Sequence, residues 1–437
     1  MKAQRKLGVD IPETAITAYE NVREKINLES ISQREQKLRH DVKSRIEEFC
    51  ELAGYEHIHK GLTSRDLTDN VEQLQILRSL RLVRSKAVAV LHQLADWSLG
   101  TKDIMLVGRT HNVPAQPITM GKRLAMFGEE IMFGLGRLDH LIENYPLRGL
   151  QGAVGTRLDQ LVLMNGDKKK VQELGEQVLE HLDCSASFNA VGQVYPRSLD
   201  VETVRALIAL SSGISSFAKT LRLMAGQGLA SEGFQQGQVG SSAMPHKMNA
   251  RTSERINGFH QILNGYGTML SGLSGDQWNE GDVSCSVVRR VALPGAFFVS
   301  DGQLEAALTV LSEMEFFEAA IKQELQQYLP FLGSTTLLIE AMRNGGGRES
   351  VYEAIKENAI AVADALRNGD LGENDLSQRL ADDERVPLDL HEIEAVLNDP
   401  DRFAASAPEQ AEAFASQVRK WTERFPEAKK LVPQVLL

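Results

Sequence analysis

Apolar residues recur every three or four positions along several long stretches of this chain. One stretch covers residues 74–100 and ends in a glycine, which is typical of a helix C-terminus. A second covers 201–224 with a spacing of about 3.5 residues, which favours packing against neighbouring helices. Further helices are expected over 252–273 and after Pro294, whereas alternating β-branched runs are scarce. The pattern therefore predicts a nearly all-α protein.

The longest predicted helices lie in the middle of the chain, which indicates a long central bundle with a smaller helical domain on each side. The first boundary is placed near residue 88. The second is placed at 344–347, where Asn-Gly-Gly-Gly breaks the helical pattern. The predicted domains are residues 1–88, 89–343 and 344–437, and a glycine-rich loop at 233–250 belongs to the middle one.

Composition narrows the class of protein. With 437 residues and 42% hydrophobic content, the chain can build more than one core without disulfide staples. Its three cysteines show no CxxC spacing, which fits a reducing cytoplasm. No uncharged stretch approaches the roughly 18 residues that would span a membrane, and the N-terminal residues show no apolar targeting segment. A net charge of −11 disfavours nucleic acid as a partner.

The most informative stretch is Gly-Ser-Ser-Ala-Met-Pro-His-Lys-Met-Asn at 240–249, between two predicted helices. Glycines upstream provide a hinge, and the hydroxyls, lysine and amide suit a lid that closes over an anion. A phosphate-binding loop of the GxxxxGK[ST] type is excluded, because no glycine precedes Lys247 and no hydroxyl residue follows it. Composition alone leaves a second interpretation equally open, a flexible connection with a solvated lysine.

The order of the residues in this stretch is more informative than its composition. It matches the signature G-S-S-x-M-P-x-K-x-N at every specified position, and the chain thereby resembles the aspartase/fumarase superfamily. Gly108-Arg109-Thr110-His111, with Gln116-Pro117, resembles a second block of that superfamily. The stretches that resemble its adenylosuccinate lyase branch are 39–42, 59–64, Gln193 and 277–280.

The resemblance implies an all-α homotetramer in which each active site gathers residues from three subunits. It also implies a carbon–nitrogen lyase without metal or other cofactor, which eliminates fumarate from adenylosuccinate and from the succinyl-aminoimidazole-carboxamide ribotide of purine biosynthesis. In such a β-elimination a base removes a proton beside a carboxylate. Cations and N–H donors then stabilise the carbanion, and an acid protonates the departing nitrogen.

By the same resemblance, Ser241 is the base, while Lys247 and Asn249 hold the substrate carboxylate. A serine hydroxyl is a poor base in water, so this role requires a closed, dry site. His111 is the implied general acid, and Glu254 orients its imidazole and raises its proton affinity. The implied substrate contacts are His59, also counted as catalytic, and Arg39, His40, Asp41, Thr63, Ser64, Gln193, Ser242, Arg255, Ser286 and Arg290.

Several of these residues also have plainer explanations. His57 and His59 resemble a metal pair, but no third ligand stands at a helpful spacing. Thr63 precedes a predicted helix with Asp66 three residues later, which is an ordinary N-cap pattern, and both roles are compatible. The charged stretch 39–41 is also what a solvated helix face would carry. Gly281 stands where many relatives carry arginine, so one phosphate contact of the family is absent or replaced.

Two rival functions remain at this point. Argininosuccinate lyase would use nearly identical chemistry with a guanidinium leaving group, and 39–41 together with the Met-Pro-His-Lys wording favours the purine enzyme. A helical structural protein that keeps the fold without catalysis is the second rival. The presence of Ser241, Lys247, His111 and Glu254 together argues against it.

Overall fold

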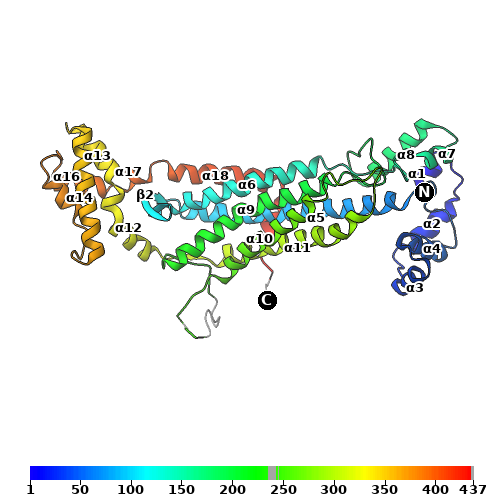
Figure 1. Ribbon diagram of the computed structural model, residues 1–437, viewed down its shortest axis with the longest axis horizontal. Coiled ribbons are helices and arrows are strands. Elements are labelled where there is room, and N and C mark those ends of the chain that lie inside the picture. Colours follow the sequence, from blue (N-terminus) through cyan, green and yellow to red (C-terminus); the bar gives the residue numbers. More distant parts are fainter. Residues whose placement is uncertain (235–242, 245, 435–437) are drawn as a thin grey trace. The chain divides into compact units, whose positions relative to one another are not determined.

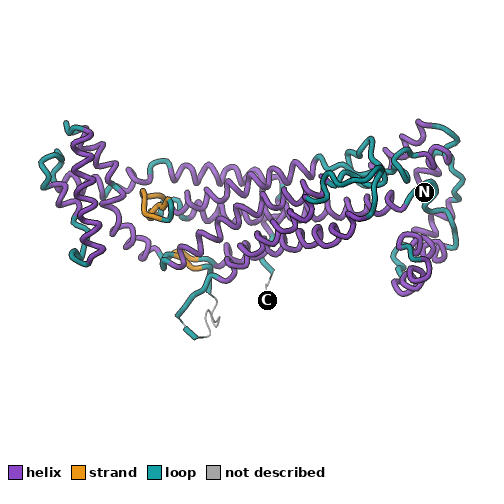
Figure 2. Tube along the Cα trace, in the orientation of Figure 1, coloured by secondary structure: helices purple, strands orange, loops and turns teal. Residues whose placement is uncertain are grey.

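The computed structural model describes residues 1–234, 243–244 and 246–434. Within these residues the chain forms eighteen α-helices, one 3-10 helix and four short strands. Figure 2 shows that the strands are confined to two small pairs among the helices. The all-α prediction is confirmed. No helix among the described residues is both long and apolar enough to cross a membrane.

The chain divides into two compact units, each built from three separate segments. The first unit comprises Met1–Leu82, Arg137–Leu207 and Leu263–Phe298, and the second comprises Val83–Gly136, Ile208–Ile262 and Val299–Leu437. Five long helices contribute residues to both units: α5 (Ser64–Gly100), α6 (Met120–Glu143), α9 (Ser198–Gly226), α10 (Arg251–Ser271) and α11 (Ser284–Glu313). The three-domain boundaries expected from the sequence remain a prediction.

The first unit also contains several shorter helices. These are α1 (Lys2–Lys6), α2 (Glu13–Val22), α3 (Leu28–Leu38), α4 (Asp41–Ala53), α7 (Leu158–Leu163) and α8 (Lys168–His181). Helices α2 and α3 both pack against α4, and α1 and α7 pack against α8. A small core of Leu7, Met164, Val171 and Leu174 joins segments that are far apart in the sequence.

The second unit contains the strands. Strands β1 (Met105–Thr110) and β2 (Val113–Thr119) form an antiparallel hairpin, and β3 (Ala230–Ser231) pairs with β4 (Glu315–Phe316). The remaining elements are α12 (Glu318–Leu332), α13 (Ser334–Arg343), α14 (Arg348–Asn368), α15 (Leu376–Ala381), α16 (Leu390–Leu397), α17 (Pro400–Ala404), α18 (Ala407–Arg424) and η1 (Pro426–Lys430). Helices α13 to α16, yellow and orange in Figure 1, enclose a core of their own.

The predicted central helices correspond to α5, α9 and α10, with ends that differ by a few residues and an earlier start for α5. The helix expected after Pro294 is present, but it begins earlier, because α11 already starts at Ser284 and includes the proline. A proline lacks one N–H and crowds the preceding turn, yet a helix continues through it when packing holds both sides. Here the buried side chain of Arg289 binds Asp200 and thereby fixes the turn before the proline.

Candidate active site

His111 lies at the tip of the β1–β2 hairpin. Thr110 pairs with Val113, so His111 and Asn112 form a two-residue turn in which φ is 53° and 62°. Two consecutive positive φ values are the mark of a type I′ turn, which matches the twist of the flanking strands. Histidine adopts this region less readily than glycine or asparagine. The strands therefore impose the conformation that leaves the exposed imidazole at the hairpin tip.

Part of the signature loop is described. Ser241 and Ser242 lie outside the described residues, whereas Lys247 is exposed and Asn249 is half-buried. Where the loop meets α10, the buried carboxylate of Glu232 accepts the amides of Thr252 and Ser253, each at 2.8 Å, and the Ser253 hydroxyl at 2.9 Å. A carboxylate at a helix N-terminus satisfies free N–H groups and complements the helix dipole. Glu232 thus fixes the first turn of α10.

Glu254 and Arg255 lie on that first turn, and both are exposed. The Glu254 carboxylate lies 3.8 Å from the guanidinium of Arg222. Within the described residues of one chain, no hydrogen bond or ion pair joins Glu254 to His111. The pairing of these two side chains remains a prediction, and a single chain does not supply it.

His59 belongs to the first unit and is held at φ 61°, with its Nε2 buried and without a partner among the described residues. Its neighbour His57 instead faces Lys60, whose Nζ lies 2.9 Å from Nδ1. The described residues hold no cluster of three metal-ligating side chains. At the start of α5 the amide of Thr63 donates to the Asp66 carboxylate at 2.9 Å, one half of a capping box.

Asp66 also connects this helix start with distant loops. Its other oxygen accepts from Arg148 Nη1 at 2.5 Å, and both side chains are fully buried. Arg148 Nη2 in turn donates to the carbonyl of Gly192 at 3.1 Å, and the next amide, of Gln193, donates to the carbonyl of Glu280 at 2.6 Å. A buried ion pair is favourable only with further hydrogen bonds of this kind. The network brings the predicted contacts Thr63 and Gln193 into one connected structure with the 277–280 stretch.

Gly281 occupies a position that the local structure restricts to glycine. Its φ is +124°, and a Cβ would lie 2.9 Å from Cγ2 of Val194. Gly192 faces the same stretch so closely that a Cβ would lie 2.1 Å from the carbonyl oxygen of Glu280. Any side chain at 281 would therefore strain the backbone and meet Val194.

The charged stretch 39–41 lies at a helix junction and not on a helix face. Arg39 has φ 53° at the end of α3. His40 caps α4 by accepting the amide of Lys43 on Nδ1 at 3.2 Å, and Asp41 is the first residue of α4. All three side chains are exposed, so capping leaves the Arg39 guanidinium and the Asp41 carboxylate open to solvent.

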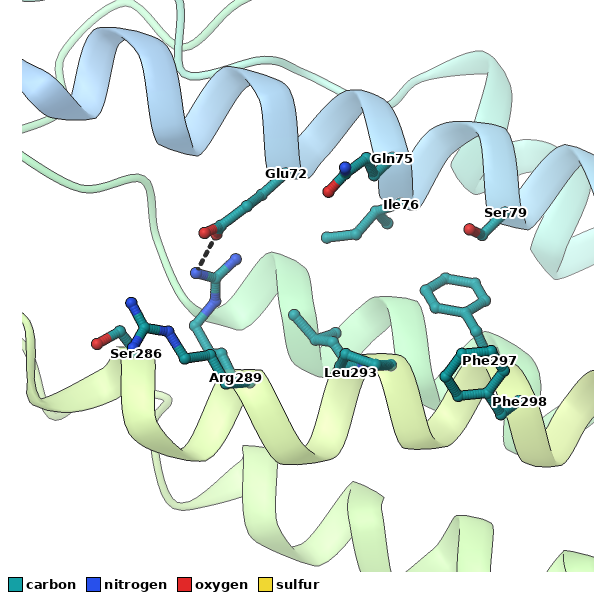
Figure 3. Close-up of a pocket in the computed structure, with 11 residues that line it drawn as sticks. Glu72, Gln75, Ile76, Ser79, Ser286, Arg289, Leu293, Phe297 and Phe298 are labelled. Carbon is teal, nitrogen blue, oxygen red and sulfur yellow. Dashed lines mark hydrogen bonds and ion pairs between the residues drawn. The ribbon is translucent and has the colours of Figure 1, made fainter. Parts of the chain in front are cut away.

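Ser286 and Arg290 line a cavity of about 320 Å³ between α5 and α11, at residues that all belong to the first unit. Figure 3 shows polar groups at one end, near Glu72 and Arg289, and phenyl rings of Phe297 and Phe298 at the other. Arg290 is exposed and has no partner among the described residues, so its guanidinium is available to bind an anion.

The adjacent Arg289 has a different role. Its guanidinium donates to Asp200 at 2.7 Å, to Glu72 at 2.6 Å and to the Tyr195 hydroxyl at 2.6 Å. Burial lowers the pKa of Arg289, but Tyr195 and the carboxylates of Asp200 and Glu72 outweigh this and raise it. Arg289 therefore stays charged and holds the first turns of α11 in place.

Sequence reasoning missed the residues that hold this site together. The clearest cases are Glu232, Arg148 and Arg289, which are buried and act through partners far away in the chain. A periodic pattern of apolar residues does not reveal which distant residue a buried charge will bind. The one signal available in the sequence was a charged residue on an otherwise apolar helix face, as at 289.

Comparison with known proteins places these features in a family. A family model described as Lyase matches residues 1–263, and one described as Adenylosuccinate lyase C-terminus matches 330–414. The adenylosuccinate lyase of Schizosaccharomyces pombe is 30% identical over 425 residues, which cover 95% of this chain and 87% of the relative. That of Saccharomyces cerevisiae is 29% identical over 424 residues, with the same coverage of 95% and 87%.

A solved structure agrees on the fold. The 3-carboxy-cis,cis-muconate lactonizing enzyme from Pseudomonas putida superposes with a TM-score of 0.81 at 19% identity, covering 96% of this chain and 92% of that one. At this identity the match speaks to the fold alone.

Proposed function

The chain belongs to the adenylosuccinate lyase family, within the aspartase/fumarase superfamily, and on that premise we propose how its residues eliminate fumarate from adenylosuccinate. The observation that carries this proposal is the similarity to adenylosuccinate lyases over nearly the whole chain. The succinyl-aminoimidazole-carboxamide ribotide is proposed as a second substrate, because it presents the same succinyl-amine group to the same chemistry.

The reaction begins with the loss of a proton from the carbon beside a carboxylate. Ser241 takes this proton, and the electron pair passes into the carboxylate, which Lys247 and Asn249 stabilise. The carbon–nitrogen bond then breaks, and His111 gives a proton to the leaving nitrogen. The exposure of Lys247 and His111 supports these roles, because both side chains are accessible to a substrate.

The catalytic groups are proposed to come from more than one subunit. Glu254 is assigned to orient the His111 imidazole, yet it pairs with Arg222 in the single chain and makes no bond to His111 among the described residues. A second copy of the chain can bring the two side chains together. This geometry supports a site that is completed by assembly.

Exposed apolar side chains on α11 support the homotetramer. Val287, Val291 and Phe298 are spaced four and seven residues apart, so they lie along one face of the helix. Their exposed fractions are 69%, 55% and 78%. An apolar stripe of this kind is unusual on a monomer and favours association between copies.

The three free cysteines fit the proposed location in a reducing cytoplasm.

The decisive experiment is an optical assay of fumarate release from adenylosuccinate, the imidazole-carboxamide substrate and argininosuccinate. We expect turnover of the first two only. Turnover of argininosuccinate alone would instead show that the chain acts as an argininosuccinate lyase. Release from none of the three would favour a helical protein without catalysis.

A further inference from the structure

The hairpin that carries His111 is attached to helix α12 by an ion pair. Nη2 of Arg109, on strand β1, lies 2.5 Å from Oε1 of Glu324. Their side chains are 17% and 15% exposed, so both charges are largely removed from water. The Arg109 guanidinium also lies 5.9 Å from the ring centroid of Tyr328 on the same helix.

The same guanidinium reaches the turn itself. Nη1 of Arg109 donates to the carbonyl of Asn112, a long hydrogen bond of 3.4 Å. The strand register shifts between Gly108 and Arg109, and an irregularity of this type re-aims the side chain that follows it. One arginine thus connects α12 with the residue that completes the positive-φ turn of His111.

The Glu324 carboxylate supplies negative charge beside two arginines, Arg109 and Arg123. Arg123, which is buried, donates to the carbonyl of Val107 on β1 at 2.8 Å. Burial lowers the pKa of Arg123, the Glu324 carboxylate opposes this shift and the charge of Arg109 adds to it, so that the pKa falls to about 10. Loss of Glu324 would therefore leave the positive charges of Arg109 and Arg123 beside the hairpin without the carboxylate that balances them.

A contribution to stability alone does not explain the Arg109–Glu324 ion pair. Nε of Arg109 and Oε2 of Glu324 are buried and find no partner among the described residues. Buried groups left unsatisfied are costly, and apolar residues of similar volume commonly replace a buried ion pair without loss of stability. What the pair provides is a fixed geometry for the turn.

We propose that Glu324 is a positioning residue, which acts through Arg109 to hold the turn that orients His111. This inference rests on the proposed role of His111 as the general acid. Glu324 lies outside every stretch that sequence reasoning connected with catalysis, and the link to His111 exists only through the fold.

The test compares Glu324→Gln with Glu357→Gln in the full-length protein. Glu357 is the control, because it forms an ion pair with Arg385 at 2.8 Å in the same unit and lies on α14, which packs against α13 and α15. For Glu324→Gln we expect kcat to fall about tenfold, with KM changed less than about twofold, since a misplaced acid acts in the transition state. Amide hydrogen exchange in peptides covering 105–119 should speed up. The control should show neither change.

A conservative variant separates positioning from general damage. Glu324→Asp, which keeps the charge, should retain more kcat than Glu324→Gln. Unchanged exchange in 105–119, unchanged kcat, or a loss of kcat in Glu324→Asp equal to that in Glu324→Gln would each overturn the proposal. Wild-type protein that releases no fumarate would refute the proposed function instead, and the exchange data would still decide whether Glu324 holds the hairpin.

Discussion

Lys247 tests the chemistry at the scale of one side chain. We expect Lys247→Met to weaken substrate binding and to lower kcat, because the ammonium meets a carboxylate that is charged in the substrate and more so in the carbanion. His246→Ala, one residue away and also exposed, is the matched control and should lose much less. Steady-state kinetics and a binding titration measure both effects. Wild-type kinetics for Lys247→Met would remove this residue from the site.

His260 gives the fold a predictable response to acid. Its Nδ1 lies 2.8 Å from the Ser211 hydroxyl. Burial lowers its pKa below the ordinary 6.5, although the charge of Glu130 opposes the shift. The unfolded chain therefore binds the proton more readily than the folded one. The stability that this provides is complete above pH 6.5 and is lost as the pH falls through the folded value.

The comparison is between wild type and His260→Gln, unfolded in urea at several pH values between 7.5 and 5. The difference in midpoint between the two proteins should shift in favour of the variant as the pH falls, because glutamine does not titrate. Acid effects common to both proteins cancel in that difference. A difference that is the same at every pH would show that His260 contributes nothing to the acid response.

At the scale of elements, α6 and α9 pack through two glycines. A Cβ on Gly134 would lie 2.5 Å from Cα of Leu210, and one on Gly213 would lie 2.7 Å from the amide of Ile131. Alanine favours a helix by about 1 kcal/mol over glycine, but overpacking costs roughly 1–3 kcal/mol, and backbone atoms cannot move aside as a side chain can. We expect Gly134→Ala to be destabilising.

Gly136→Ala is the control for that substitution, since it lies on the same helix and a Cβ there would meet nothing within 4 Å. It should leave the unfolding midpoint unchanged or raise it slightly. Equal midpoints for Gly134→Ala and Gly136→Ala would contradict the close approach of α6 and α9.

The same elements show what the sequence could predict. Helices α5, α9 and α10 were foreseen because each buries a stripe with helical periodicity, a property of the local pattern. The start of α11 was not, since its first turns depend on Arg289 and on partners near residues 72 and 200. Long-range ion pairs of this type have no local signal.

The candidate site divides in the same way. His111 and Lys247 were predicted because their motifs are contiguous in the sequence, and both side chains are exposed. Arg148 and Glu324 were not found, because each acts on a segment far from its own. A motif identifies the reacting groups, whereas the groups that hold them appear only in the folded chain.

At the scale of the whole molecule, the proposal makes the active site a property of the assembly. Separate contributions from two chains mean that a defect in one residue can be complemented by another chain. His111→Ala and Ser241→Ala proteins should each be inactive as pure homotetramers. Each subunit of either variant still carries the other residue intact, so mixed tetramers can contain complete sites.

The two variants are therefore to be dissociated, mixed in equal amounts and reassembled. When His111 and Ser241 of one site come from different chains, each is intact with a probability of one half, so about one site in four should recover. We expect activity to return to about a quarter of that of wild-type protein taken through the same steps. If both residues came from one chain, every site would lack one of them and the mixture would stay inactive. An inactive mixture beside a recovered wild type would thus refute the shared site while leaving the assignment of the fold intact.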